Sequence, residues 1–382
     1  MRKTRLFTPG PTPLMPEVQE ALARPIIHHR TPEFQDLFLQ ARSNLQKIFR
    51  TRHDLVILAC SGTGGMEAAV ANLLGPQSHA LAVVIGKFGE RWHEICKACK
   101  IPCSLLCKEY GQAASVQEIR QEMQSHPRVD ALLIQGCETS TATSNDLQAI
   151  GGLIRREFPQ TLLVVDGITS VACEAVDTDG WGLDVVISGS QKAFALPPGL
   201  SFVSISPRAL ERMQKASTSP YYLNLALEAR LQAQGKTAFT ASVSLVAALL
   251  EATRSILDQG LDNVIEETAL MARTARAGLQ ALGFTLLSSS PANACTAAYP
   301  PGGIEAGRLA RRMQERLGLR VAGGQGKLKG KIIRIAHLGY FDLLDVFTVL
   351  SALELTLIDM GHSIEAGSGV RAAMQQACLQ AV

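Results

Sequence analysis

The stretch Val185-Val186-Ile187-Ser188-Gly189-Ser190-Gln191-Lys192-Ala193 begins with β-branched residues and ends with small polar residues and a lysine. Its apolar half is typical of a buried strand. A lysine that directly follows such a strand lies near the strand's end, where partial burial would lower its pKa and make it a nucleophile. A solvated surface lysine is the commoner alternative. Lys192 is therefore a candidate catalytic residue that needs support from other segments.

Strand-like and helical patterns alternate through the first two thirds of the chain. This alternation predicts an α/β fold with a mostly parallel sheet covered by helices on both faces. The last two strand-like runs are separated by Pro197-Pro198-Gly199 and no helix, so we expect that pair to be antiparallel. The strand-like runs are Leu55–Ala59, Ala80–Ile85, Ala131–Gln135, Leu162–Val165, Val185–Ser188 and Ser201–Ser206.

The pattern changes after a long helical region from Val243 to Gln280, which is broken near Gly260. Short strand-like and helical segments then mix, which predicts a smaller C-terminal α+β domain. The proline-rich start of the chain cannot be helical and is expected to be extended. We predict an N-terminal arm at 1–16, a large domain at 17–257 and a small domain at 258–382.

Composition excludes several classes of protein. The net charge of +3 gives no reason to expect nucleic acid or an anionic membrane as a partner. No apolar run reaches the roughly eighteen residues of a membrane span, and we expect a cytoplasmic protein. The odd count of nine cysteines suggests reduced thiols, and for the cluster Cys96, Cys99, Cys103 and Cys107 we expect plain thiols and no metal. The last two of these lie in the apolar run Ile101–Cys107, which predicts a buried strand.

Two further motifs support a site near Lys192. Ser61-Gly62-Thr63-Gly64-Gly65 follows a predicted strand and opens a helix, so its backbone N–H groups could hold a phosphate. Asp166 follows the strand Leu162–Val165, which places its carboxylate at the sheet edge where ligands bind. Taken singly, the first could be a plain glycine-rich turn and the second a helix cap. Together with Lys192 they match the phosphate, ring nitrogen and aldehyde of pyridoxal 5'-phosphate.

With these motifs the chain resembles the class V aminotransferases of pyridoxal-phosphate fold type I, most of all the alanine–glyoxylate and serine–pyruvate (serine–glyoxylate) aminotransferase group. The resemblance covers nearly the whole chain. The residues that carry it are Pro9-Gly10-Pro11-Thr12, Ser61–Gly64, Lys87-Phe88-Gly89-Glu90-Arg91, Glu138-Thr139-Ser140-Thr141, Val165-Asp166, Ser188–Ala193 with Pro197-Pro198-Gly199, and Ile333-Arg334-Ile335.

The resemblance implies a role for each matching residue. Lys192 would form the internal aldimine and move the proton, and Asp166 would keep the ring nitrogen protonated. Phe88 and Ile168 would contact the two faces of the ring, and Thr139 would bind its hydroxyl oxygen. Ser61, Gly62, Thr63 and Gln191 would bind the phosphate.

The resemblance also implies a substrate group and a partner. Arg334 would bind the substrate carboxylate through its planar guanidinium. In a homodimer, Thr240 of the partner subunit would complete the phosphate site. Ala238, Ala241 and Ala142 depart from the residues that relatives often have there, which puts the local loop shapes in doubt.

The implied activity is transfer of an amino group from alanine or serine to a 2-oxo acid such as glyoxylate or pyruvate. One alternative is a 2-aminoethylphosphonate–pyruvate transaminase. A cysteine desulfurase-like lyase is less favoured, because Gln191 and Phe88 stand where those enzymes have histidine. From another class, a non-catalytic α/β binding protein is opposed by the presence of Lys192, Asp166 and Arg334.

Overall fold

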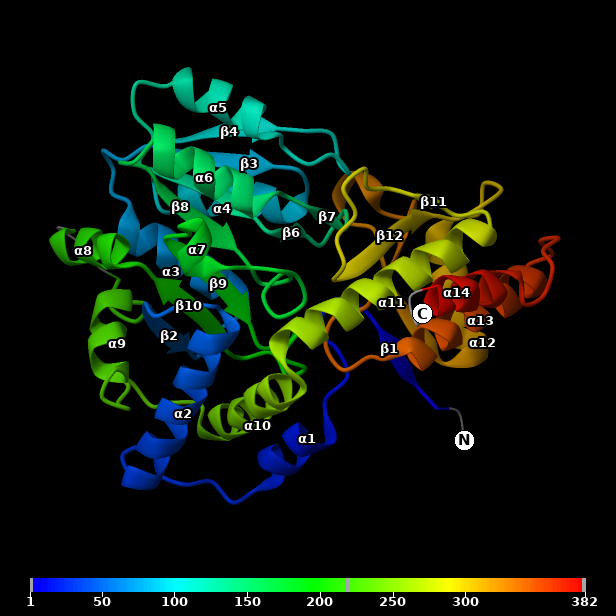
Figure 1. Cartoon of the computed structure of the whole chain (residues 1–382), viewed down its shortest axis with the longest axis horizontal. Coiled ribbons are helices and arrows are strands. Elements are labelled where there is room, and N and C mark those ends of the chain that lie inside the picture. Colours follow the sequence, from blue (N-terminus) through cyan, green and yellow to red (C-terminus); the bar gives the residue numbers. More distant parts are fainter. Residues whose placement is uncertain (1–2, 217–219, 380–382) are drawn as a thin grey trace.

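The computed structural model describes residues 3–216 and 220–379, and its largest feature is a seven-stranded sheet. The sheet has the order β2-β10-β9-β8-β5-β3-β4 (Figure 1). All neighbouring pairs from β9 to β4 are parallel, whereas β10 is antiparallel to both β9 and β2. The predicted α/β class and the antiparallel pair are therefore confirmed. The strands are β2 Asp54–Leu58, β3 Ala80–Val84, β4 Cys103–Cys107, β5 Ala131–Gln135, β8 Leu162–Asp166, β9 Val185–Gly189 and β10 Ser201–Ile205.

Helices cover both faces of this sheet. Alternate residues of a strand point to opposite faces, so Leu55 and Ile57 of β2 join one core and Val56 and Leu58 join the other. Helices α2, α5, α6 and α10 pack on the first core, and α3, α4, α8 and α9 pack on the second. The helices of this part are α1 Pro16–Ala23, α2 Pro32–Ile48, α3 Gly62–Leu73, α4 Lys87–Ala98, α5 Val116–Gln124, α6 Leu147–Glu157, α7 Thr178–Trp181, α8 Pro207–Lys215, α9 Leu225–Gln232 and α10 Val243–Gln259.

Strand β4 corrects one expectation. The apolar run Ile101–Cys107 predicts a buried strand, but β4 is the edge of the sheet and pairs only with β3 among the described strands. Its side chains are therefore partly exposed, with Leu105 at 37%. All nine cysteines are free thiols, and within residues 3–216 and 220–379 no group of three or more histidine, cysteine or acidic side chains could hold a metal ion.

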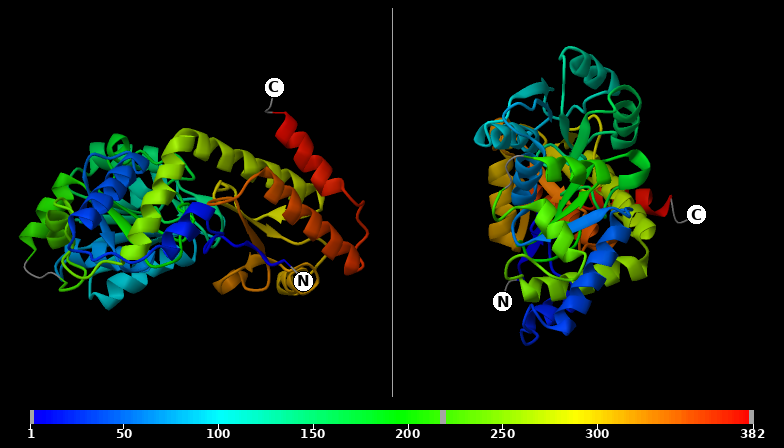
Figure 2. Two further views of the ribbon diagram at one scale, coloured as in Figure 1. Left: turned by 90° about the horizontal axis from the view of Figure 1, so that it is seen from below. Right: turned by 90° about the vertical axis from the view of Figure 1, so that its left-hand side faces the viewer.

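A second sheet of five strands forms the other lobe of the molecule (Figure 2). Its order is β1-β13-β14-β12-β11, and β1 comes from the N-terminal arm to pair in parallel with β13. The sequence predicted the arm as extended but missed this pairing and missed β13. The strands and helices are β1 Arg5–Phe7, β11 Thr285–Leu286, β12 Cys295–Tyr299, β13 Leu319–Gly323, β14 Ile333–Ala336, α11 Leu261–Ala281, α12 Ala306–Leu317, η1 Gly326–Leu328, α13 Leu343–Asp359 and α14 Ser368–Cys378.

The helical region divides at Gly260, whose φ of +87° ends α10 before α11 begins. The chain passes from the first lobe to the second through these two helices (Figure 2). The boundaries at residues 16 and 257 stay a prediction. Of the helices that the structure describes, none is long and apolar enough to cross a membrane.

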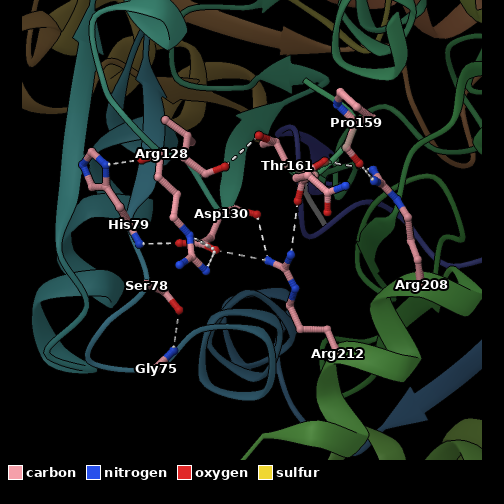
Figure 3. A network of polar contacts seen from close by, with 11 residues as sticks. Gly75, Ser78, His79, Arg128, Asp130, Pro159, Thr161, Arg208 and Arg212 are labelled. Atoms are coloured by element: carbon pink, nitrogen blue, oxygen red, sulfur yellow. Dashed lines mark hydrogen bonds and ion pairs between the residues drawn. The ribbon is translucent and has the colours of Figure 1, made fainter. Parts of the chain in front are cut away.

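A polar network joins the amino ends of the parallel strands to helix α8. Arg208 and Arg212 of α8 donate hydrogen bonds to backbone carbonyls beside the starts of β5 and β8, among them Asp130 and Thr161 (Figure 3). Asp184 accepts hydrogen bonds from Leu163 N at 2.8 Å, Ser206 Oγ at 2.8 Å and Arg208 Nε at 2.5 Å. The Asp184 side chain is only 4% exposed, so it accepts hydrogen bonds from donors that water cannot reach.

We expect Asp184→Ala to lower the free energy of unfolding by about 2–4 kcal/mol, because a backbone N–H, a hydroxyl and a guanidinium would lose their acceptor. Urea unfolding of the full chain measures this change. Glu211→Ala removes an exposed ion pair to Lys215 on the same helix and should change stability by less than about 0.5 kcal/mol. Equal changes in the free energy of unfolding for the two substitutions would show that the buried network does not stabilise the fold.

Candidate active site

A cavity of about 240 Å³ opens at the carboxyl ends of the parallel strands, where α/β sheets bind ligands. It brings together segments that are up to 188 residues apart in the chain, from Gly10 to Pro198. Its lining consists of Gly10, Pro11, Ser61, Gly62, Thr63, Phe88, Arg91, Thr139, Asp166, Ile168, Thr169, Gln191, Lys192 and Pro198. Nine of the eleven site residues predicted from the sequence are in this lining.

Lys192 lies beyond the end of β9 and is buried beneath the N-terminal arm. Its Nζ donates a hydrogen bond to the carbonyl of Pro9, and its own carbonyl accepts one from Thr12 Oγ1 at 3.1 Å. A Cβ atom on Gly10 would lie 2.8 Å from Nζ, so only glycine lets the arm approach so closely. Burial lowers the pKa of Lys192, which favours the neutral, nucleophilic amine.

Asp166 is the last residue of β8, and it is buried at the cavity. Its Oδ1 accepts a hydrogen bond from Ile168 N at 3.0 Å. Burial raises the pKa of the Asp166 carboxyl to about 7, although the backbone hydrogen bond and Lys192 oppose the shift. A cationic group placed beside it would hold the carboxylate ionised.

The glycine-rich segment forms the start of helix α3, with Ser61 as its N-cap. The Ser61 side chain makes no capping hydrogen bond, so the first N–H groups of α3 face the cavity together with its hydroxyl. Ile168 packs against this turn, because a Cβ on Gly62 would come within 2.5 Å of its Cδ1. Gln191 lies in the same lining, and its Oε1 is buried without a hydrogen-bond partner among the described residues.

Phe88 is held at the cavity by a buried carboxylate. Glu138 Oε2 accepts hydrogen bonds from the N–H groups of Phe88 at 3.0 Å and Gly89 at 2.9 Å, which are in the first turn of α4. An anion at a helix N-terminus is stabilised by the helix dipole. Burial nevertheless raises the pKa of Glu138. This anchor explains how a residue of α4 is fixed beside strands β5 and β8.

Thr139 connects the cavity to the second sheet. Its Oγ1 donates to Thr169 Oγ1 at 2.6 Å, and its carbonyl accepts from Arg334 Nη1 at 2.9 Å. Arg334 Nε also donates to Gly323 O at 3.0 Å, so the guanidinium is held between the two lobes. Arg334 is buried, but it adjoins the cavity through Thr139 and is not in its lining.

Thr240 is the predicted site residue that the structure places elsewhere. It is exposed and lines a separate small cavity with Tyr222 and Phe239. Within one subunit it therefore makes no contribution to the cavity of Lys192.

Sequence reasoning gave no role to Gly10, Arg91 and Thr169, which also line the cavity. Arg91 follows Phe88 by three residues on α4, and this spacing puts both side chains on one helix face. The spacing from Phe88 could therefore have indicated that Arg91 lies at the cavity. The contact between Gly10 and Lys192 joins residues 182 positions apart, and no local pattern predicts it.

Comparison with known proteins adds independent evidence. A sequence model of the family Aminotransferase class-V matches residues 8–330. The soluble hydrogenase 42 kDa subunit of Anabaena cylindrica is 36% identical over 97% of this chain and 98% of its own length. The serine–glyoxylate aminotransferase of Arabidopsis thaliana is 30% identical over 96% of this chain and 94% of its own.

Solved structures agree with the sequence comparison. The aspartate aminotransferase of subgroup IV from Thermus thermophilus superposes with a TM-score of 0.87 at 35% identity, covering 93% of this chain and 99% of that one. An alanine–glyoxylate aminotransferase from Nostoc sp. gives 0.89 at 29% identity, covering 94% and 96%. The predicted fold type I of pyridoxal-phosphate transferases is thereby confirmed. The chain is an enzyme of the class V aminotransferase family.

Proposed function

We propose that this enzyme uses pyridoxal 5'-phosphate to transfer an amino group from a small amino acid, alanine or serine, to glyoxylate or pyruvate. The observation that carries the proposal is the shared cavity of Lys192, Asp166 and the Ser61–Thr63 turn. Relatives named for serine–glyoxylate and alanine–glyoxylate transfer support the choice of substrates.

The residues present fit this cofactor. The α3 turn supplies N–H donors for a phosphate, and the side-chain amide nitrogen of Gln191, which lies in the same lining, could add another donor. Asp166 is a buried carboxylate that a protonated ring nitrogen would pair with. Lys192 is a buried amine with a lowered pKa. When bound, the cofactor supplies an aldehyde for the amino group and a ring that accepts electrons from the substrate.

The residues of the chain supply the remaining chemistry. Lys192 Nζ acts as the base that takes the proton from the substrate α-carbon, and its lowered pKa suits that task near neutral pH. Phe88 and Ile168 of the same lining would contact the cofactor ring from two sides, and Thr139 would bind its hydroxyl oxygen. Pro9-Gly10-Pro11 covers Lys192 and limits access of water to the proton-transfer site.

We infer that Arg334 binds the α-carboxylate of the substrate. Its position beside Thr139 and its planar guanidinium suit a carboxylate at the edge of the cavity. The cations of the described lining itself are Lys192, which is committed to the cofactor, and Arg91, which contacts Thr63 and Phe88. A second substrate carboxylate would therefore lack a dedicated cation, which favours small uncharged donors.

We also infer that the enzyme is a homodimer in which Thr240 of the partner subunit completes the phosphate site. The exposed position of Thr240, outside the cavity of its own subunit, supports this assignment. Aromatic side chains gather beside it, since Phe239 packs with both Tyr221 and Tyr222, which are exposed. Exposed aromatic residues of this kind are enriched at interfaces.

Borohydride reduction of the purified protein should attach the cofactor to Lys192, as peptide mass spectrometry would show. Lys192→Ala and Lys192→Arg should both abolish the attachment and reduce turnover by several orders of magnitude, because neither variant offers a primary amine at this position. Lys97→Ala, on the exposed side of α4, should keep both. Attachment at any other lysine, or a wild-type protein that takes up no pyridoxal 5'-phosphate, contradicts the proposal.

Half-reactions with alanine, serine, aspartate, glutamate and 2-aminoethylphosphonate should proceed fastest with alanine or serine. The change in absorbance of the bound cofactor measures each rate. The physical reason is that neither lining cation is directed to a second acidic group on the donor, because Lys192 serves the cofactor and Arg91 contacts Thr63 and Phe88. Rapid conversion with aspartate alone would contradict this choice and would agree with the similarity to the Thermus thermophilus aspartate aminotransferase.

Asp166→Asn should change how the stability of the cofactor-free protein depends on pH. The pKa of Asp166 is about 7 in the folded protein and about 3.9 in the unfolded chain, so the folded state holds a proton that the unfolded state releases. Its contribution to stability is therefore lost as pH rises toward and through 7. Urea unfolding should show that the free energy of unfolding of the variant, relative to that of the wild type, rises by a few kcal/mol between pH 5 and 8. With the cofactor bound, the wild type should be the more stable protein, because the ring nitrogen would then pair with the Asp166 carboxylate. A difference in the free energy of unfolding that does not vary with pH would contradict the claim that burial raises the pKa of Asp166.

A further inference from the structure

The cavity contains a cation for which the activity described above has no use. Arg91 lies one turn beyond Phe88 on α4, and its guanidinium carbon is 4.8 Å from the centroid of the Phe88 ring. Its Nη1 donates a hydrogen bond to Thr63 Oγ1 at 3.1 Å. Arg91 thus touches both the ring-stacking residue and the turn of the phosphate cradle.

Arg91 has no acidic partner within the described residues. The neighbouring carboxylate of Glu90 pairs with Lys87 and accepts a hydrogen bond from Tyr110. Asp166 is close enough to feel the charge of Arg91, but the two form no ion pair. A half-buried guanidinium in a cavity is costly unless an anion compensates it, and five N–H donors suit a phosphate or carboxylate.

The hydrogen bond from Arg91 also determines what Thr63 can do. Because Thr63 Oγ1 accepts from the guanidinium, the hydroxyl proton of Thr63 is free to be donated into the cavity. An acceptor placed between Ser61, Thr63 and the start of α3 would receive this proton together with the backbone N–H groups. The positive charge behind the hydroxyl strengthens it as a donor.

We propose that Arg91 is a binding residue for the cofactor phosphate: it supplies the positive charge within the subunit and orients the Thr63 hydroxyl toward the same anion. This inference rests on the proposed use of pyridoxal 5'-phosphate. The N-terminus of α3 offers only about half a positive charge, and the phosphate is a dianion near neutral pH. One arginine compensates most of the negative charge that the helix N-terminus leaves unbalanced.

The test compares two cofactor forms that differ only in the phosphate. Dissociation constants of pyridoxal 5'-phosphate and pyridoxal are measured by quenching of intrinsic fluorescence in the cofactor-free full-length protein. Both compounds carry the same aldehyde, so any bond to Lys192 cancels in the ratio of their affinities. Arg91→Gln should weaken pyridoxal 5'-phosphate about ten- to a hundredfold and pyridoxal by less than about threefold.

Two further variants make the result specific. Arg91→Lys keeps the charge without the planar fork and should recover part of the loss. Lys97→Gln removes one positive charge from the last turn of the same helix and should leave both constants unchanged. Thermal unfolding of each cofactor-free variant verifies that α4 is intact.

Other outcomes overturn the inference. Equal weakening of both compounds by Arg91→Gln would mean that Arg91 only positions Phe88 and Thr63. No change in either constant would mean that the guanidinium is merely solvated. Failure of the proposed function is distinct from both, because wild-type protein would then bind neither compound. Inorganic phosphate still tests Arg91 in that case: it should raise the unfolding temperature of the wild type more than that of Arg91→Gln, and equal shifts would count against the proposal.

Discussion

The register between β8 and β9 is the constraint on which the site depends. Asp166 pairs with Ile187 across these parallel strands, so Lys192 follows five residues beyond a position that is fixed opposite the carboxylate. A slip of one residue would turn every side chain of a strand to the other face of the sheet. Both strands are buried on both faces, in the core of α2, α6 and α10 and in the core of α3 and α4. The packing of apolar residues therefore determines where the acid and the amine meet.

Burial has opposite effects on the two groups that this register brings together. It raises the pKa of Asp166 and lowers the pKa of Lys192, so both are driven toward their neutral forms in the absence of a ligand. The proposed cofactor would supply a cationic ring nitrogen that restores the charge of Asp166 and an aldehyde that suits the neutral amine of Lys192. The same desolvation therefore prepares both partners for one molecule. A phosphate would need the opposite environment, and we assign that task to the N–H groups of the α3 turn and to Arg91, which line the same cavity.

Local patterns predicted much of the large sheet, because its strands are short apolar runs between amphipathic helices. They predicted the strand β4 but not its partial exposure at the sheet edge, and they missed β1, whose partner β13 is more than three hundred residues away. The chemically reactive residues were recognisable because each follows a strand or opens a helix. Gly10 was not assigned a role, because its requirement comes from the distant side chain of Lys192 and not from its own neighbours. Arg334 was a candidate from the sequence, but its hydrogen bond to Thr139 depends on how the two sheets meet.

The N-terminal arm makes the second sheet part of the active site. Strand β1 pairs with β13, β13 pairs with the strand β14 that carries Arg334, and the arm continues from β1 to cover Lys192. One sheet therefore holds both the arm that covers Lys192 and the guanidinium of Arg334, which we assign to the substrate carboxylate. Any displacement of that sheet relative to the large one would move both groups together with respect to Lys192. Because Thr12 also bonds the Lys192 carbonyl, the arm is tied at both ends. The spacing between the arm over Lys192 and the guanidinium of Arg334 is thus set by backbone pairing within one sheet, which resists small changes in side-chain packing better than a loop would.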